Sequence, residues 1–229
     1  MKKIILKYFN KFYHGTLLGK KISKAYHYCK NRYVPEKIIA KHQYKKNFGV
    51  FPDLKNPQTL NEKIVWLKLN HRTSLHTMCA DKYLVRNYVK SKIGEEYLVP
   101  LIAMFKNAEE LNPENLPEHN FVIKTNHDSG GVYLIKNKQN VNWNPLIEEL
   151  AKKLKQNYYY RSKEWQYKNI EPCIVVEEML LDKEGKIPPD YKVHCFNGVV
   201  NMIQVDAGRG TDNHFRNFYN TNWEREPFK

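Results

Sequence analysis

The chain has 229 residues and a mass of 27.3 kDa, enough for one large domain or two small ones with a buried core. Hydrophobic residues make up 41% of the sequence and aromatic residues 13%, which excludes a disordered or low-complexity chain. No apolar stretch approaches the roughly 20 residues that span a bilayer. The four cysteines form no CxxC pair and predict neither a zinc ribbon nor a disulfide framework: Cys29, Cys79, Cys173 and Cys195.

The net charge of +14 is concentrated at the start of the chain. Residues 1–47 contain 13 Lys or Arg and a single acid, Glu36, whereas the remainder is close to neutral. Lysines interrupt the first apolar residues and no small-residue cleavage site follows, so we expect a cytoplasmic protein rather than a secreted one. No nucleic-acid-binding signature accompanies the charge, so we expect no nucleic-acid partner.

Residues 1–47 also carry apolar side chains at helical spacing, among them Leu17, Leu18, Ile22 and Tyr26. Two interpretations stay open. The segment is either a basic amphipathic helix on the anionic inner face of the plasma membrane, or a helix that packs on the body of the protein with its lysines in solvent.

Helical signals dominate the next part of the chain. Thr59 stands three residues before Glu62, a capping box that predicts a helix start. A second helix is predicted from Asp81 to a stop near Gly94, and a strand over residues 97–105.

Strand signals dominate from residue 121 onward. Residues 121–124 and 132–135 are β-prone runs around a glycine-bearing turn, and a helix is predicted over residues 145–156. Residues 173–180 indicate a buried strand that ends in carboxylates, and residues 191–205 a hairpin that turns at Asn197 and Gly198.

Three groups of residues could carry chemistry. Lys124 precedes a turn with two glycines, which would let backbone N–H groups approach a phosphate; a plain hairpin turn is the alternative. Glu177 and Glu178 end the buried strand and need solvent, a cation or a ligand hydroxyl as partner; an exposed acidic strand end is the alternative. Asp190 and Lys192 share one strand face, where a structural ion pair is the competing interpretation.

In combination, these segments resemble the ATP-grasp superfamily, and within it the TupA-like branch linked to teichuronopeptide and surface polysaccharide synthesis. The resemblance covers roughly residues 45–229 and rests on residues 54–69, 80–102, 121–135, 157–180, 190–206 and 216–228. It implies an α+β fold with a helical amino-terminal region and two mainly antiparallel sheet lobes. The implied organisation is a basic segment (1–47), a helical region (48–119) and an ATP-grasp region (120–229), with a nucleotide-binding lobe over about 120–182 and a carboxyl-terminal lobe from about 183.

The resemblance also implies an ATP site. Arg86, in the place of the family's usual lysine, and Lys124 would contact phosphates, and Lys192, oriented by Asp190, would reach the terminal phosphate as the catalytic pair. Glu177 would mark the hinge, with backbone groups near Glu178 and Leu180 at the adenine and Asp182 or Glu184 at the ribose. The loop expected to fold over the phosphates consists of His127, Asp128, Ser129, Gly130 and Gly131.

The chemistry that the resemblance implies is phosphoryl transfer from ATP to a carboxylate, followed by amide formation with an amine. The acceptor would be an acidic glycan or lipid-linked precursor of capsule, teichuronic-type polymer or lipopolysaccharide. Mg²⁺ is the family's second cofactor, but its ligands lie beyond the stretch that matches residues 217–228, so we expect an incomplete carboxyl-terminal lobe and assign no metal ligand. Catalytic competence therefore stays open. A glycosyltransferase of polysaccharide assembly and a non-catalytic nucleotide-binding remnant are the alternative functions.

Overall fold

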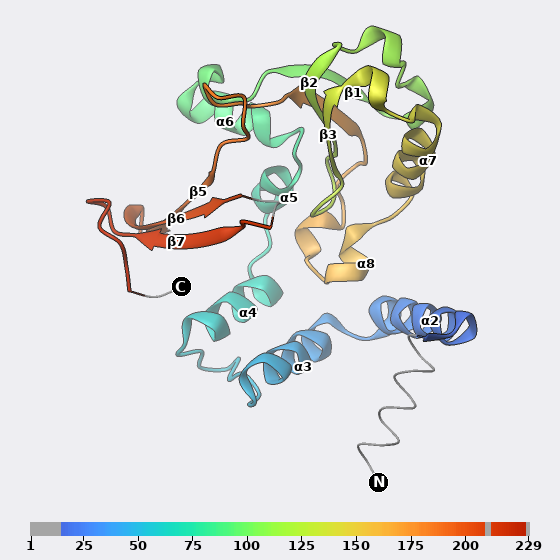
Figure 1. The fold of residues 1–229 in the computed structure, drawn as a ribbon. Helices are drawn as coiled ribbons and strands as arrows, with labels where there is room; N and C mark the ends of the chain where they lie inside the picture. Colours follow the sequence, from blue (N-terminus) through green and yellow to red (C-terminus); the bar gives the residue numbers. More distant parts are fainter. Residues whose placement is uncertain (1–14, 209–211, 228–229) are drawn as a thin grey trace. The chain divides into compact units, whose positions relative to one another are not determined.

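The computed structural model describes residues 15–208 and 212–227 (Figure 1). The chain forms two compact units, Met1–Glu178 and Met179–Lys229, and each is described here by itself. The first unit combines helices with a four-stranded antiparallel sheet, and the second contains a three-stranded antiparallel sheet. The predicted α+β class is therefore confirmed.

The amino-terminal part of the first unit is helical, in agreement with the sequence. Its helices are α2 (Leu17–Tyr33), α3 (Glu36–Phe48), α4 (Leu60–Asn70), α5 (Ser74–Ala80) and α6 (Val85–Ile93). The predicted capping box is present at α4, where Thr59 and Glu62 exchange side-chain and backbone hydrogen bonds. Among the described residues, no helix is long and apolar enough to cross a bilayer.

The predicted helix start at Asp81 is wrong by four residues. The Asp81 carboxylate accepts hydrogen bonds from the backbone N–H groups of Tyr83, at 2.8 Å, and Leu84, at 3.2 Å. These are the bonds of a helix N-cap, but i→i+3 bonds to the Tyr83 and Leu84 carbonyls follow, so the regular α-helix α6 begins only at Val85. The stop at Gly94 is confirmed, with this glycine at a φ of 110°.

Four strands form the sheet of the first unit. They are β1 (Leu101–Phe105), β2 (His119–Thr125), β3 (Val132–Asn137) and β4 (Ile174–Glu178), in the order β1-β4-β2-β3. The first strand is shorter than predicted, because residues 95–97 form a 3₁₀ turn, Glu95–Tyr97. The β2–β3 hairpin and the buried strand β4 match their predictions.

Helix α7 (Trp143–Leu154) packs against one face of this sheet (Figure 1). Leu146 and Leu150, predicted from their four-residue spacing, are buried there. They meet Phe121 and Ile123 of β2 and the alternate β4 residues Ile174 and Val176. The period of two along a strand therefore directs the intervening side chains, those of Val122, Lys124, Val175 and Glu177, to the opposite face. The short helix α8 (Tyr158–Ser162) follows α7.

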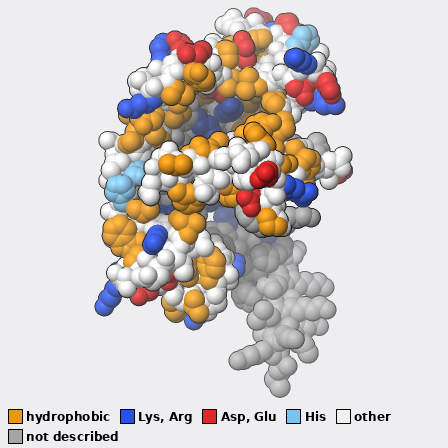
Figure 2. Space-filling model, turned by 90° about the vertical axis from the view of Figure 1, so that its left-hand side faces the viewer, with side chains coloured by type: hydrophobic (Ala, Val, Ile, Leu, Met, Phe, Trp, Pro, Cys, Tyr) orange, Lys and Arg blue, Asp and Glu red, His pale blue; other side chains and the backbone are white. Residues whose placement is uncertain are grey.

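The second unit consists of β5 (Asp190–Phe196), β6 (Val199–Ala207) and β7 (Phe215–Tyr219) in sequential order. Asn197 and Gly198 form the predicted hairpin turn with φ of 50° and 80°. Tyr191 and Val193 of β5 are exposed apolar residues on one face of the sheet. Hydrophobic side chains reach the surface in several places on the side of the molecule drawn in Figure 2.

Candidate functional site

The candidate site is built on the face of the four-stranded sheet that α7 does not cover, which we call the open face. Its central group is the Glu177 carboxylate at the end of β4, which is buried. Glu177 Oε2 lies 2.5 Å from Lys124 Nζ, and Glu177 Oε1 lies 2.9 Å from Arg86 Nη1. One buried carboxylate therefore holds two cations side by side, from β2 and from α6.

The physical reason for this cluster is the cost of burying an unpaired charge. A carboxylate without a partner at this depth would destabilise the fold by several kcal/mol, on the order of the penalty for an uncompensated buried ion. Lys124 and Arg86 keep 26% and 14% of their side-chain surface exposed, so both can still reach a ligand in solvent. With one acid and two bases, the cluster carries one net positive charge.

Apolar surface adjoins these cations. On the same face of β3, Val132 and Leu134 pair with Lys124 and Val122, and about half of the surface of each β3 side chain is exposed. The open face therefore offers an apolar area beside two cations. This combination suits a ligand in which a flat ring carries a polyphosphate, because the ring needs apolar surface and the phosphates need cations.

The glycine turn is attached to the site by Asn126, whose side chain is buried. Its Nδ2 donates to Asp81 Oδ1 at 3.0 Å and to the Glu171 carbonyl at 2.9 Å, while its Oδ1 accepts from the Cys173 N–H at 2.7 Å. These bonds join β2, the segment before β4 and the turn before α6. No motif in the sequence predicts this role for Asn126.

The expected phosphate-covering loop is held at one end. His127 is buried, and its Nε2 lies 3.2 Å and 3.1 Å from the carbonyl oxygens of Lys153 and Gln156 at the end of α7. The Asp128 carboxylate lies 3.4 Å from Lys82 Nζ and 3.9 Å from Lys153 Nζ. Ser129 and Gly130 are exposed, so these two residues form the tip of the loop.

Gly131 closes the loop in a conformation that requires glycine. Its φ is 59°, and a Cβ atom there would lie 2.5 Å from Thr125 Oγ1 and 2.7 Å from Asp128 Oδ2. Thr125 Oγ1 is buried and, among the described residues, has no hydrogen-bond partner. At the base of the loop, the Thr125 hydroxyl is therefore a polar group without a partner, and it lies close to the backbone of Gly131.

Lys82 is a further cation at the loop, and no motif in the sequence predicts a role for it. Its ammonium donates to the carbonyl oxygens of Thr125, at 2.8 Å, and Asp128. Burial lowers the pKa of Lys82, although the Asp128 carboxylate acts in the opposite direction. Lys82 therefore fixes the backbone of the loop rather than projecting into solvent.

The remaining predicted site residues are Glu178, which is the last residue of the first unit, and residues of the second unit. Glu178 is exposed at the end of β4, and its backbone N–H already donates to the Pro100 carbonyl at 3.1 Å. Leu180 is exposed, Asp182 accepts from the N–H groups of residues 184 and 186, and Glu184 forms an exposed ion pair with Lys186.

Lys192 lies on one face of the second sheet in a charged network. Its ammonium forms an ion pair with Asp206, whose side chain is fully buried and which also accepts from Arg216 Nε at 2.6 Å. The hydrogen bonds from Arg216 and Lys192 hold the pKa of Asp206 well below its usual range. Asp190 starts the same strand, on the same face.

The described residues contain no group of three His, Cys, Asp or Glu side chains close enough to hold a metal ion.

Two antiparallel sheets, a strand lysine before a glycine loop and a carboxylate at the end of a buried strand are features that the resemblance to the ATP-grasp class led us to expect. The family model described as TupA-like ATPgrasp matches residues 62–229, and the chain belongs to that family. Neither a curated protein nor a solved structure matches the chain. Proteins of the ATP-grasp class bind ATP and Mg²⁺.

Proposed function

We propose that this chain binds ATP on the open face of the four-stranded sheet, with Lys124 and Arg86 as ligands of the phosphates. The observation that carries the proposal is the pair of cations held together by Glu177 in a chain of an ATP-binding family. The cluster of Lys124, Arg86 and Glu177 carries one net positive charge. The negative charges of a polyphosphate would offset this charge, and the two cations would donate charge-assisted hydrogen bonds to the phosphate oxygens. The adjacent Val132 and Leu134 would contact the apolar ring.

The reaction we propose is the ATP-dependent joining of a carboxylate to an amine in surface polysaccharide synthesis. The γ-phosphoryl group would pass to a carboxylate oxygen, leaving ADP and an acyl phosphate; the amine would then displace phosphate to form an amide. Lys124 and Arg86 would bind and orient the phosphates, and the loop at Gly131 would exclude water. The roles implied for Asp190, Lys192, Leu180 and Glu184 stay predictions.

The first prediction concerns Lys124. ATP at one hundred times its Kd should stabilise the folded wild type by about 2.7 kcal/mol and raise its melting temperature. A Lys124→Met variant should lose most of this rise relative to its own ATP-free baseline, since it removes a phosphate ligand. Differential scanning fluorimetry, with and without Mg²⁺, measures both values.

Lys152→Met is the matched control, because Lys152 is an exposed lysine on α7, on the other side of the sheet. It should keep the full ATP response. A wild type that shows no rise in melting temperature with ATP would overturn the proposal. Transfer of sugar from a nucleotide sugar, without ATP turnover, would favour the glycosyltransferase alternative instead.

We also propose that the basic amino-terminal segment lies on an anionic membrane surface. The observation in favour is the exposure of the apolar side chains of α2, which range from Leu17 at 81% to Ile22 at 43%. The first turn of α2 holds no acid, and its last turn holds Lys30 and Arg32. Exposed apolar residues on a basic helix suit a surface of anionic headgroups.

The second prediction tests this surface. The wild type should cosediment with phosphatidylglycerol vesicles, less so in 0.5 M NaCl, and not with phosphatidylcholine vesicles. A Leu18→Ser/Ile22→Ser variant should bind several-fold more weakly because it removes apolar area. A Leu134→Ser variant, which removes an exposed leucine of the sheet, should bind as the wild type does. Equal binding by all three proteins would refute a contact through α2.

A further inference from the structure

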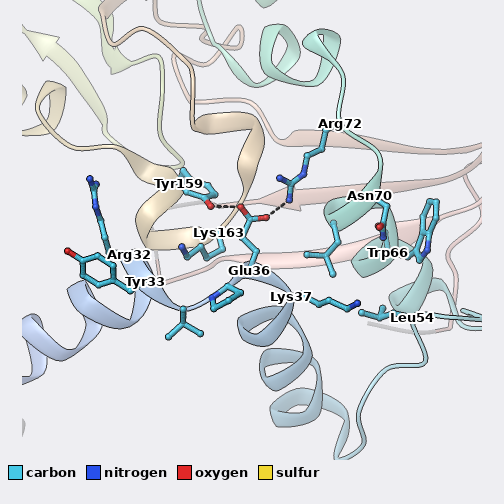
Figure 3. Close-up of a pocket in the computed structure, with 13 residues that line it drawn as sticks. Arg32, Tyr33, Glu36, Lys37, Leu54, Trp66, Asn70, Arg72, Tyr159 and Lys163 are labelled. Carbon is cyan, nitrogen blue, oxygen red and sulfur yellow. Dashed lines mark hydrogen bonds and ion pairs between the residues drawn. The ribbon is translucent and has the colours of Figure 1, made fainter.

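The helical part of the first unit contains a cavity with a largely basic lining. A cavity of about 490 Å³ lies among the end of α2, the start of α3, the end of α4 and helix α8 (Figure 3). Its volume is within the range of about 300–1,000 Å³ that small-molecule sites have. None of the residues that line it belongs to the open-face cluster.

The charged groups of this cavity are mostly basic. Arg32, Lys37, Arg72 and Lys163 line it, and Glu36 is its single acid. Glu36 forms an ion pair with Arg72 and accepts a hydrogen bond from the Tyr159 hydroxyl, and Figure 3 shows it between these two side chains. Glu36 therefore compensates the charge of Arg72.

The Glu36 carboxylate stays charged in this position. Burial acts to raise the pKa of Glu36, but the hydrogen bonds from Tyr159 and Arg72 outweigh it, and the pKa is lowered. Burial and the contact with Glu36 raise the pKa of Tyr159 to about 12, so its hydroxyl remains a donor at neutral pH. The Arg72–Glu36–Tyr159 arrangement is thus a fixed wall of the cavity.

Lys163 is the unusual group. It is 7% exposed, and its ammonium lies 4.9 Å and 5.8 Å from the ring centres of Tyr159 and Tyr160. The described residues offer this ammonium no hydrogen bond and no ion pair. Burial lowers the pKa of Lys163, and the neighbouring cations Lys168 and Arg32 add to that effect, whereas Glu36 opposes it. An ammonium that lies against two tyrosine rings and near other cations, in a side chain that is largely buried, would be stabilised by an anion bound beside it.

Arg32 lies against the Tyr160 ring as well, but it is exposed. Its guanidinium lies 4.4 Å from the centre of the Tyr160 ring, and within the described ranges no carboxylate pairs with it. Lys37 likewise has no ion-pair partner among these residues. Of the four cations of the cavity, Arg72 alone forms an ion pair with a carboxylate of the described residues.

We propose that this cavity binds a small ligand that carries a phosphate or carboxylate group, with its oxyanion at Lys163 and Arg32. The aromatic side chains of Tyr33 and Trp66 also line the cavity and offer flat apolar surface to a ring that bears the anion. The inference is independent of nucleotide binding, because it uses none of the residues of the open face.

Isothermal titration calorimetry of the full chain at low ionic strength tests the proposal with three probes: inorganic phosphate, glucose 1-phosphate and glucuronate. Saturable binding of at least one probe is expected, and the probe that binds most tightly distinguishes a phosphate site from a carboxylate site. A Lys163→Gln variant should bind it at least tenfold more weakly. Lys124→Met should bind it as the wild type does, even though its response to ATP is reduced.

The matched control is Lys168→Gln. Lys168 is exposed and its ammonium lies 5.3 Å from the centre of the Tyr159 ring, but Lys168 does not line the cavity. It should retain binding. If Lys163→Gln does not fold, Arg32→Gln decides, because Arg32 is exposed on α2. The proposal is overturned if no probe binds saturably, or if folded Lys163→Gln and Arg32→Gln variants bind as tightly as the wild type.

Discussion

At the scale of single residues, Glu177 decides the electrostatics of the open face. Its carboxylate is the described partner of both Lys124 and Arg86, and all three side chains are largely buried. Without the negative charge, two cations would face each other at the edge of a low-dielectric sheet. Glu177 therefore has two roles: it neutralises buried positive charge, and it holds Lys124 and Arg86 in the geometry that we propose for phosphate binding.

The third prediction follows from this dual role. Glu177→Gln should lower the free energy of unfolding by about 2 kcal/mol, because it leaves two partly buried cations without a carboxylate. Urea unfolding followed by fluorescence measures the change. Glu178→Gln, at the exposed neighbouring position, should change stability by less than about 0.5 kcal/mol. Equal stability of the two variants would show that the ion pairs contribute nothing net.

At the scale of elements, the loop between β2 and β3 is constrained at its base and exposed at its tip. His127 and Asp128 are attached to α7 and Lys82, whereas Ser129 and Gly130 have solvent around them. Gly130 and Gly131 both have positive φ, at 111° and 59°. They differ in surroundings, since a Cβ on Gly130 would meet nothing within 4 Å.

The fourth prediction uses this difference. Gly130→Ala should destabilise the fold by about 1–2 kcal/mol through backbone strain alone. Gly131→Ala should cost at least about 1 kcal/mol more, because its Cβ would overlap Thr125 Oγ1 and the Asp128 carboxylate. Urea midpoints of the two variants provide the comparison. A Gly131→Ala variant as stable as Gly130→Ala would mean that the base of the loop can move aside.

At the scale of the whole molecule, stability should depend on pH through carboxylates in both units. In the first unit, backbone hydrogen bonds from Thr59 and Asp53 lower the pKa of Glu62 to about 2. In the second unit, Arg216 and Lys192 lower the pKa of Asp206. A carboxyl whose pKa is lower in the folded state stabilises the fold above its unfolded pKa, about 3.9 for Asp, and that contribution is lost as pH falls through the interval between the two pKa values.

The fifth prediction is acid sensitivity of the second unit through Asp206. The wild type should lose stability below about pH 4, as protons compete with Arg216 and Lys192 for the carboxylate. Asp206→Asn should be less stable at pH 7 and lose less stability on acidification. Urea unfolding between pH 3 and pH 7 measures both effects. Asp212→Asn changes an exposed acid of the same unit and should show the pH dependence of the wild type. If the stability of Asp206→Asn fell with pH in parallel with that of the wild type, Asp206 would not be the source of the acid sensitivity.

Local signals in the sequence were sufficient for most elements. The Thr59–Glu62 capping box, the leucine spacing of α7 and the Asn197–Gly198 turn each depend on residues a few positions apart. Such short-range interactions favour one backbone conformation wherever the segment lies. The start of α6 was predicted four residues early: Asp81 does cap a turn, but that turn is closed by i→i+3 bonds and the regular helix begins only at Val85.

The sequence by itself determined most local elements and, through its resemblance to the ATP-grasp superfamily, the fold class, the family and the candidate cations, because motifs and their order are properties of the chain. Only the tertiary structure decided which charges meet. Glu177 reaches Arg86 across 91 positions and Lys124 across 53, and Tyr159 reaches Glu36 across 123. No periodicity encodes such pairs, since they form only when packing removes water from around the charges and makes an unpaired one costly.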